Sequence, residues 1–288
     1  MRRVGRFLVL FALLCVSAAP LRHVAAADVH DGRALRLGIA PFSSVPVLLR
    51  MHEPLRDALA QALAREVTVF SAANHERFRS NALSGNYDIV IAPAHFLPVL
   101  IDNGYVPLVR YRNPFELLLV TRKSSGIREV EDLRGRIIGL PDYLSFFYFV
   151  GKQWLDTLGW RAGRDYTLSE QPSHTSALLA VHSGQIDAAL TSLPPWLLLK
   201  SNVRSRLVPI NTGIPPLPSM TTLVRKDLGA KAVDRIRTAL NAFSRSSQGK
   251  RFFETTGYGG YVTFEAADVE NARRYKGVMR RSSRPDMR

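Results

Sequence analysis

The sequence predicts an α/β protein made of two similar lobes, each a mainly parallel sheet flanked by helices. One observation is a pattern that occurs twice: an amphipathic helix, a Ser-Gly pair, an aspartate and an apolar strand. Its landmarks recur at one offset, since Gly85 and Gly184 are 99 residues apart, as are Asp88 and Asp187. Strands also alternate with helices of ten or more residues, which is typical of parallel α/β sheets. Because the period has the size of a domain, the repeat indicates duplicated lobes rather than a solenoid.

The first part of the chain alternates four apolar strands with three helices. Leucines at helical spacing follow Pro46, Asn74 is suited to cap the second helix, and Pro93 begins the third. The strands are expected at residues 35–40, 66–70, 87–92 and 106–110, and the helices at 46–64, 74–85 and 93–103.

Two proline-rich breaks divide the chain. The first is Arg112-Asn113-Pro114, and the second is the segment 211–218, which holds three prolines and a glycine. Between them we expect strands at 115–122, 137–140, 166–168, 186–190 and 206–210, and helices at 129–135, 145–158, 173–184 and from Pro194. After them we expect a strand at 220–225 and helices at 231–246, 249–254 and 266–275 that pack on the first lobe. The expected domains are therefore lobe 1 at 35–112 and 219–276, lobe 2 at 113–218, a hinge of two crossings between them, and a basic flexible tail at 277–288.

The first 27 residues have the pattern of a secretory signal peptide. Arg2 and Arg3 belong to a basic start, an unbroken apolar run covers residues 7–16, and small residues precede Asp28. An uncleaved membrane anchor is the alternative, although the apolar run is about half the length that spans a bilayer. Cleavage would remove Cys15, the only cysteine, so the mature chain would have no disulfide and no thiolate site.

The chain is strongly basic, with 39 Lys and Arg against 24 Asp and Glu and a formal charge of +15. Such a balance suits nucleic acid, an anionic membrane or an anionic ligand. An export signal argues against nucleic acid, and the basic residues are scattered except at the C-terminus. We therefore expect an exported protein of about 261 residues, long enough for two lobes with their own cores.

The polar residues that follow the predicted strands are the candidates for binding. In open α/β sheets ligands bind beyond the carboxyl ends of the strands, and free amides at a following helix N-terminus attract anions. Capping of those helices uses the same residue types, so each hydroxyl has two possible roles. We expect the following residues to line a cleft between the lobes: Ser43, Ser44, Pro93, Ala94, His95, Tyr143, Ser145, Ser173, His174 and Thr175.

Catalytic and metal chemistry find little support in the sequence. It contains no Gly-x-Ser-x-Gly, no His-Glu-x-x-His and no phosphate-binding Gly-x-x-x-x-Gly-Lys-Ser/Thr motif. Ser173 and His174 are neighbours at a helix start, which aims their side chains apart, and the seven histidines show no metal-ligand spacing. We expect a binding protein rather than an enzyme, with no cofactor and no metal.

Residues 35–260 resemble the phosphate/phosphite/phosphonate-type substrate-binding proteins of ABC transporters, which are periplasmic and have a two-lobe type II fold. The resemblance rests on Leu-Gly-Ile-Ala-Pro at 37–41, Tyr-Asp-Ile-Val-Ile-Ala-Pro-Ala-His-Phe at 87–96, Glu-Asp-Leu-Arg-Gly at 131–135 and Ser-His-Thr-Ser-Ala-Leu-Leu-Ala-Val at 173–181. It implies a periplasmic solute-binding protein, present as a monomer, that delivers a small ligand to an ABC permease in the inner membrane.

The chain departs from this family at one place that matters for the ligand. Where the family has a Ser-Thr-Ser-like anion-binding turn, residues 143–148 read Tyr-Leu-Ser-Phe-Phe-Tyr, and only Ser145 keeps such a hydroxyl. These aromatic side chains either stack on an organic ligand or pack in the core. The expected ligand is therefore small and anionic, either phosphonate- or phosphate-like or organic. The alternatives in function are a periplasmic sensor that signals to a membrane histidine kinase and an exported enzyme on the same fold.

Overall fold

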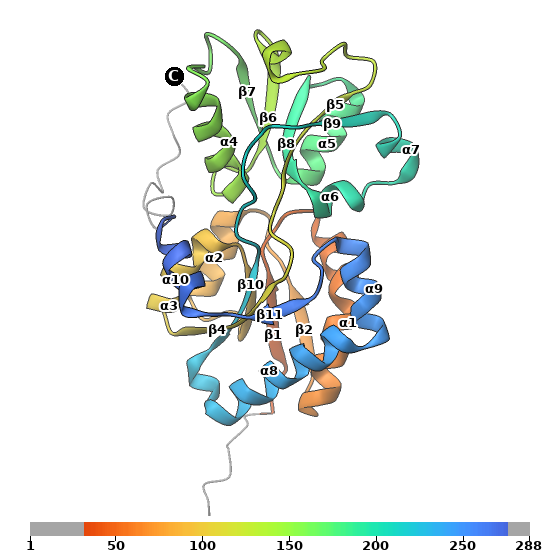
Figure 1. Ribbon diagram of the computed structural model, residues 1–288. Coiled ribbons are helices and arrows are strands. Elements are labelled where there is room, and N and C mark those ends of the chain that lie inside the picture. Colours follow the sequence, from red (N-terminus) through yellow and green to blue (C-terminus); the bar gives the residue numbers. More distant parts are fainter. Residues whose placement is uncertain (1–31, 276–288) are drawn as a thin grey trace, which may run out of the picture. The chain divides into compact units, whose positions relative to one another are not determined.

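Two separate sheets organise the chain. The computed structural model describes residues 32–275, so the expected signal peptide at 1–27 and the basic tail at 277–288 lie outside the described residues. The first sheet has six strands and the second has five, and helices flank both (Figure 1). None of the helices within residues 32–275 is long and apolar enough to cross a membrane.

The first sheet takes its strands from both ends of the described chain. In spatial order they are β11 (Tyr261–Thr263), β4 (Tyr105–Tyr111), β10 (Thr221–Arg225), β3 (Ile89–Ala92), β1 (Leu35–Ile39) and β2 (Val67–Phe70). β1 is parallel to β2 and β3, whereas β10 is antiparallel to both β3 and β4.

The second sheet is built only from the middle of the chain. Its strands are, in spatial order, β7 (Thr167–Gln171), β6 (Ile137–Pro141), β8 (Ala188–Ser192), β5 (Leu117–Arg122) and β9 (Leu207–Ile210). β6 is parallel to β7 and β8, and β5 is antiparallel to β8 and β9. The order β9-β5-β8-β6-β7 matches β4-β10-β3-β1-β2 of the first sheet strand for strand. This common topology explains the repeat in the sequence.

The helices fall into two groups, according to the sheet whose strands they connect. With the first sheet are α1 (Val45–Leu63), α2 (His75–Leu83), η1 (Ala94–Phe96), α3 (Leu97–Asp102), η3 (Lys226–Leu228), α8 (Ala230–Arg245), α9 (Ser247–Thr256) and α10 (Ala266–Arg273). With the second are η2 (Val130–Leu133), α4 (Phe146–Thr157), α5 (His174–Ser183), α6 (Leu193–Leu197) and α7 (Ser201–Arg204).

Apolar side chains at helical spacing pack these helices against the sheets. In α8 the four residues predicted to share one face, Val233, Ile236, Leu240 and Phe243, are all buried. Burial of each side chain of this size stabilises the fold by about 2 kcal/mol. The largest cluster of buried apolar side chains contains residues of both sheets, including Leu37 and Leu140.

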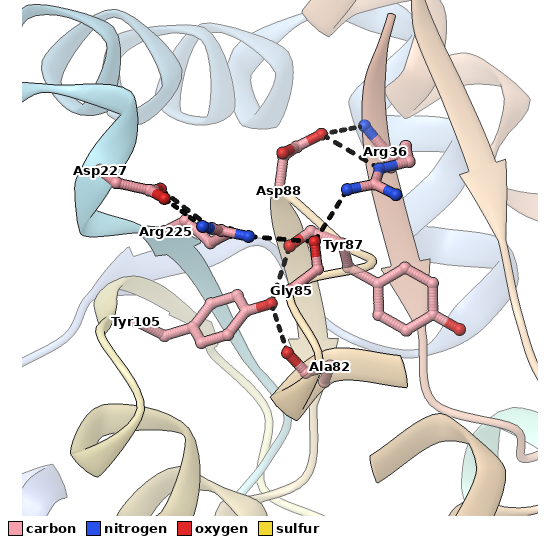
Figure 2. A network of polar contacts seen from close by, with 8 residues as sticks. All are labelled: Arg36, Ala82, Gly85, Tyr87, Asp88, Tyr105, Arg225 and Asp227. Carbon is pink, nitrogen blue, oxygen red and sulfur yellow. Dashed lines mark hydrogen bonds and ion pairs between the residues drawn. The ribbon is translucent and has the colours of Figure 1, made fainter. Parts of the chain in front are cut away.

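The aspartate of the repeated pattern accepts the same kind of hydrogen bond in both sheets. Asp88 precedes β3 and accepts the Arg36 amide of β1 at 2.8 Å, and Asp187 precedes β8 and accepts the Ile137 amide of β6 at 2.9 Å. Each aspartate thus ties the start of one strand to its parallel neighbour. Figure 2 shows the first copy, with Asp88 against Arg36.

An arginine on the antiparallel strand completes each copy of this motif. Arg225 of β10 donates to the Gly85 carbonyl oxygen at 3.0 Å (Figure 2), and Arg122 of β5 donates to the Val181 carbonyl oxygen at 2.8 Å. Both arginines therefore satisfy carbonyl groups at a helix C-terminus, where cations are favoured. Gly85 and Gly184 have φ of 71° and 87°, the left-handed conformation that a helix stop requires.

The chain passes between the two sheets at the two predicted breaks. These connecting segments are 112–116 and 211–220, and both run between the sheets in Figure 1. Phe115 and Leu217 form an antiparallel bridge in which each amide donates to the other carbonyl oxygen at 2.8 Å. The two segments therefore support each other, and a hinge at this position stays a prediction.

The structure differs from the sequence-based expectations in β11, in η2 and in η3, where no helix was expected. β11 lies in a segment for which no strand was expected, because the strand has only three residues and follows two glycines. The helix expected at 129–135 is a single turn of 3-10 helix, η2, held by a capping box between Glu129 and Asp132.

Candidate functional site

The carboxyl ends of strands from both sheets converge on one small cavity. Loops after β1, β3, β6 and β8 contribute to it, together with the starts of α4 and α5. Its volume is about 30 Å³, which is room for roughly two water molecules. The lining residues are Ala40, Phe42, His75, Pro93, Phe115, Ser145, Phe146, Phe147, His174, Ser192, Pro194, Pro195, Met220 and Tyr258.

Ser145 and Ser173 are placed at the cavity by the helices that they cap. Ser145 begins α4, and its hydroxyl accepts the Phe147 amide at 3.3 Å. Ser173 begins α5, and its hydroxyl accepts the Ser176 amide at 3.1 Å. Of the two roles open to these hydroxyls, capping is therefore realised at both positions.

His174 lies at the centre of the polar lining. Its Nε2 is 3.5 Å from the Ser145 hydroxyl and its Nδ1 is 3.3 Å from the Thr191 hydroxyl, while the Phe147 ring meets it edge-on at 4.9 Å. Burial, and to a smaller extent the nearby His75, lower the pKa of His174 to about 3. The imidazole is therefore neutral at neutral pH and presents a polar edge without a formal charge.

His95 connects the two sheets beside the cavity. Its Nε2 donates to the Leu144 carbonyl oxygen at 2.9 Å, and the Phe146 ring stacks on the imidazole at 5.2 Å with an interplanar angle of 14°. Burial lowers the pKa of His95 to about 3, against the opposing effect of its bond to Leu144. Leu144 lies in the loop after β6 and Phe146 begins α4, so His95 acts here as a contact between the lobes.

Asp142 makes the second strong contact between the sheets. Its carboxylate accepts the His75 amide at 3.0 Å and the Leu144 amide at 2.8 Å, and the His75 Nδ1 lies 3.6 Å away. Burial alone raises the pKa of a carboxyl, but these hydrogen bonds and the interaction with His75 outweigh it, so the pKa of Asp142 lies below its usual value. The negative charge of Asp142 therefore occupies the N-terminus of α2, where an anion is favoured.

Two further hydrogen bonds cross between the sheets. Thr175 donates to the Ser43 hydroxyl at 2.9 Å, and Tyr143 donates to Glu76 at 3.2 Å. Both involve residues expected in the cleft from the sequence.

The ten expected site residues thus take different places. Pro93, Ser145 and His174 line the cavity. Four others, Ser43, His95, Tyr143 and Thr175, bond across the sheets near it. Ser173 caps α5, Ala94 is buried in η1, and Ser44 is exposed at the start of α1. A contact between any of them and a ligand stays a prediction.

The sequence analysis did not predict most of the apolar residues that line the cavity. Phe115, Met220 and Tyr258 lie in or beside the connecting segments and the return loop, far from the strand ends in the sequence. Phe146 and Phe147 were weighed as core or as stacking residues, and both are buried while lining the cavity. Pro194 and Pro195 were expected only as a helix start.

A larger hollow lies elsewhere on the second sheet's side of the chain. It has a volume of about 830 Å³ and is lined by residues that include Ile127, Trp154 and Ile210. None of the ten expected site residues lines it, so it is no candidate for the predicted binding site.

The two sheets have the same topology, and their strand ends meet at one cavity. This arrangement is that of two-lobe binding proteins, and solved structures of such proteins have the same fold. PhnD1 from Prochlorococcus marinus in complex with methylphosphonate is 14% identical over 86% of this chain and 99% of that chain, with a TM-score of 0.75. A binding protein component of an ABC phosphonate transporter from Pseudomonas aeruginosa is 17% identical over 87% and 88%, with a TM-score of 0.73. A Xanthomonas citri protein bound to chloride ion is 17% identical over 86% and 98%, with a TM-score of 0.67.

The family follows from the sequence itself. The family model of the ABC transporter, phosphonate, periplasmic substrate-binding protein matches residues 37–269, which is most of the chain. The chain belongs to this family. It is a periplasmic solute-binding protein of a transport family, not of an enzyme family, and the resemblance stated from the sequence is confirmed.

Proposed function

We propose that the chain captures a small organic solute in the cavity between the two sheets and delivers it to an ABC permease. The observation that carries this proposal is that residues of both sheets line one cavity, with His75 and Pro93 on the first side and Ser145 and His174 on the second. A ligand that contacts both lobes at once stabilises their closed arrangement, because only that arrangement makes both sets of contacts.

The lining favours an organic body over an inorganic oxyanion. Its polar groups are the side chains of His75, Ser145, His174 and Ser192, and the remaining lining residues are apolar or aromatic. No lysine or arginine within residues 32–275 is among them. A buried phosphonate dianion without a cation would keep a large desolvation cost, so the organic alternative fits this cavity better.

Solute entry requires the two lobes to move apart. A cavity of about 30 Å³ holds no organic solute, and the contacts at Asp142, His95 and Thr175 hold the lobes together beside it. We place the hinge in the connecting segments 112–116 and 211–220. The contacts between the lobes include hydrogen bonds, which opening replaces with hydrogen bonds to water, and apolar contacts such as the Phe146 ring on His95.

The recognising partner is an inner-membrane permease. In this account the closed form, with both lobes around the solute, is the one that docks, and a monomer is sufficient. The signal peptide predicted at 1–27 supplies the route to the periplasm.

Native mass spectrometry of the freshly purified mature chain, followed by calorimetry with the released solute, tests this function. Ser145→Ala and His174→Ala are each expected to weaken solute binding at least tenfold, whereas Ser201→Ala on the exposed α7 leaves it unchanged. Unchanged affinity in both cavity variants would discard the assignment of the site.

A further inference from the structure

The last described helix, α10, is held to the first sheet, but the residues that follow it contact the second sheet's helix α4. α10 packs on α3 and η1, and Arg110 of β4 donates to Asp268 of α10 at 2.8 Å. Two residues beyond α10, the Tyr275 ring meets the Phe146 ring edge-on, with centroids 4.7 Å apart and an interplanar angle of 83°. Phe146 is the first residue of α4. The end of α10 therefore forms a contact between the lobes.

Phe146 connects this contact to the cavity. It lines the cavity and is only 1% exposed. Two rings from the first sheet's side contact the Phe146 ring: the His95 imidazole stacks on it at 5.2 Å, and Tyr275 approaches it edge-on. Tyr275 itself is outside the set of described residues that line the cavity. A substitution at Tyr275 therefore removes a support of the cavity wall and leaves the lining residues unchanged.

Both partners of this contact lie outside the pattern that the chain shares with its family. Phe146 belongs to the segment 143–148, in which only Ser145 matches the family's anion-binding turn. Tyr275 lies beyond residue 269, where the match to the family model ends. The ring pair is therefore a property of this chain that the family assignment does not supply.

Separation of the lobes breaks the ring pair. The partly buried ion pair between Arg110 and Asp268 holds α10 to the first sheet, and Ala272 of α10 is buried in the core. Phe146, in contrast, moves with α4 and the second sheet. The two rings are therefore in contact only in the closed arrangement, and opening exposes their apolar surface to water. An edge-on aromatic pair changes an equilibrium constant by a factor of about two to ten.

We propose that Tyr275 is a latch for the closed form: its contact with Phe146 positions one wall of the cavity and holds the lobes together around the solute. Tyr275 acts through Phe146 and is therefore a positioning residue. The latch lowers the fraction of open molecules, and because solute enters and leaves through the open form, it slows solute exchange. This inference rests on the proposed function, in which the closed form traps the solute.

Single-molecule energy transfer between dyes on the two lobes measures the fraction of open molecules. The dyes are attached at Ser201→Cys on α7 and Asp234→Cys on α8, both exposed positions, and residues 28–288 contain no other cysteine. The mature chain is first refolded from guanidinium chloride to remove any solute retained on purification. Tyr275→Ala is expected to raise the ratio of open to closed molecules about fivefold.

Two matched variants and a double-mutant cycle assign the effect to the ring pair. Tyr275→Phe keeps the ring, and Arg274→Ala changes the exposed neighbouring residue, so both are expected to leave the ratio unchanged. In a Phe146→Leu background, Tyr275→Ala is expected to change the ratio by less than about twofold, because the partner ring is already absent. If Phe146→Leu does not fold, the variants at 274 and 275 still decide the inference, since Tyr275 is only half-buried.

Each other outcome overturns the inference. A wild-type chain without a measurable closed population, a ratio that Tyr275→Ala leaves unchanged, an equal rise in Tyr275→Phe or Arg274→Ala, or a full effect of Tyr275→Ala in the Phe146→Leu background would do so. The distance between the lobes is measured without solute, so the latch and the proposed function fail separately. Unchanged solute affinity in Ser145→Ala and His174→Ala overturns the proposed function, whereas an unchanged ratio in Tyr275→Ala overturns the latch alone.

Discussion

Three fully buried histidines predict a steep loss of stability between neutral and mildly acidic pH. Burial lowers the pKa of His52 to about 4 and that of His95 and His174 to about 3. In the unfolded chain each has a pKa of about 6.5. Below that value the unfolded state binds more protons than the folded state, so stability is full above pH 6.5 and is lost as the pH falls toward 3.

The size of the effect follows from these shifts. At pH 5 each histidine costs about 2 kcal/mol, because the pH is about 1.5 units below the unfolded pKa. The three together cost about 6 kcal/mol, which is comparable with the whole stability of many domains. Asp142, whose pKa is lowered, adds to the loss only below about pH 4.

Equilibrium unfolding in guanidinium chloride, followed by tryptophan fluorescence, measures this loss. Between pH 7.5 and 5.0 the free energy of unfolding of the mature chain is expected to fall by about 6 kcal/mol. His52→Leu removes one of the three groups and is expected to reduce the fall by about a third, whereas His182→Asn keeps all three and the full fall. A free energy that is constant over this range would refute the burial of neutral imidazoles.

The duplicated motif of the two sheets gives two further predictions, both measured by the same unfolding assay. Asp88→Ala is expected to lower the free energy of unfolding by about 3 kcal/mol and Asp187→Ala by about 1 kcal/mol, because the first carboxylate is fully buried and the second is partly exposed. Equal losses in the two variants would contradict this reasoning. Gly85→Ala is expected to destabilise more than Gly184→Ala. Both glycines have positive φ, but a Cβ at Gly85 would overlap with the Arg225 side chain, whereas a Cβ at Gly184 would make an ordinary contact with the Arg122 side chain at 3.7 Å.

Local patterns predicted the architecture because the same physical constraint occurs twice. Asp88 and Asp187 must each pair with the amide of a neighbouring strand, and Gly85 and Gly184 must each end a helix in the left-handed conformation. These constraints act within a few residues of the chain, so they leave a readable signal. Both sheets, which share one strand order, carry these constraints at equivalent positions.

The cavity was less predictable because its walls come together only in the folded chain. Ser145 and His174 follow strand ends, and that position marked them in the sequence. Phe115 and Tyr258 reach the cavity from connecting and return segments that have no periodic pattern. Their position depends on how the two sheets face each other, which no local preference encodes.

The capping serines show a second reason why the binding site could not be predicted from the sequence alone. Ser145 and Ser173 satisfy the first amides of their own helices, and the same residue type would be required for binding an anion. Sequence alone left both roles open. The distances in the folded chain assign capping, and the chemistry of the rest of the wall then becomes decisive for the ligand.

A reversible disulfide between the lobes tests the central claim, that solute exchange at this cavity requires the lobes to open. The Ser43 and Thr175 side-chain oxygens are 2.9 Å apart across the sheets, so cysteines at both positions are close enough to pair. Residues 28–288 contain no other cysteine. In the Ser43→Cys/Thr175→Cys protein, oxidation is expected to stop exchange of the retained solute and reduction to restore it. Solute exchange at the same rate in the oxidised and reduced forms would contradict the account.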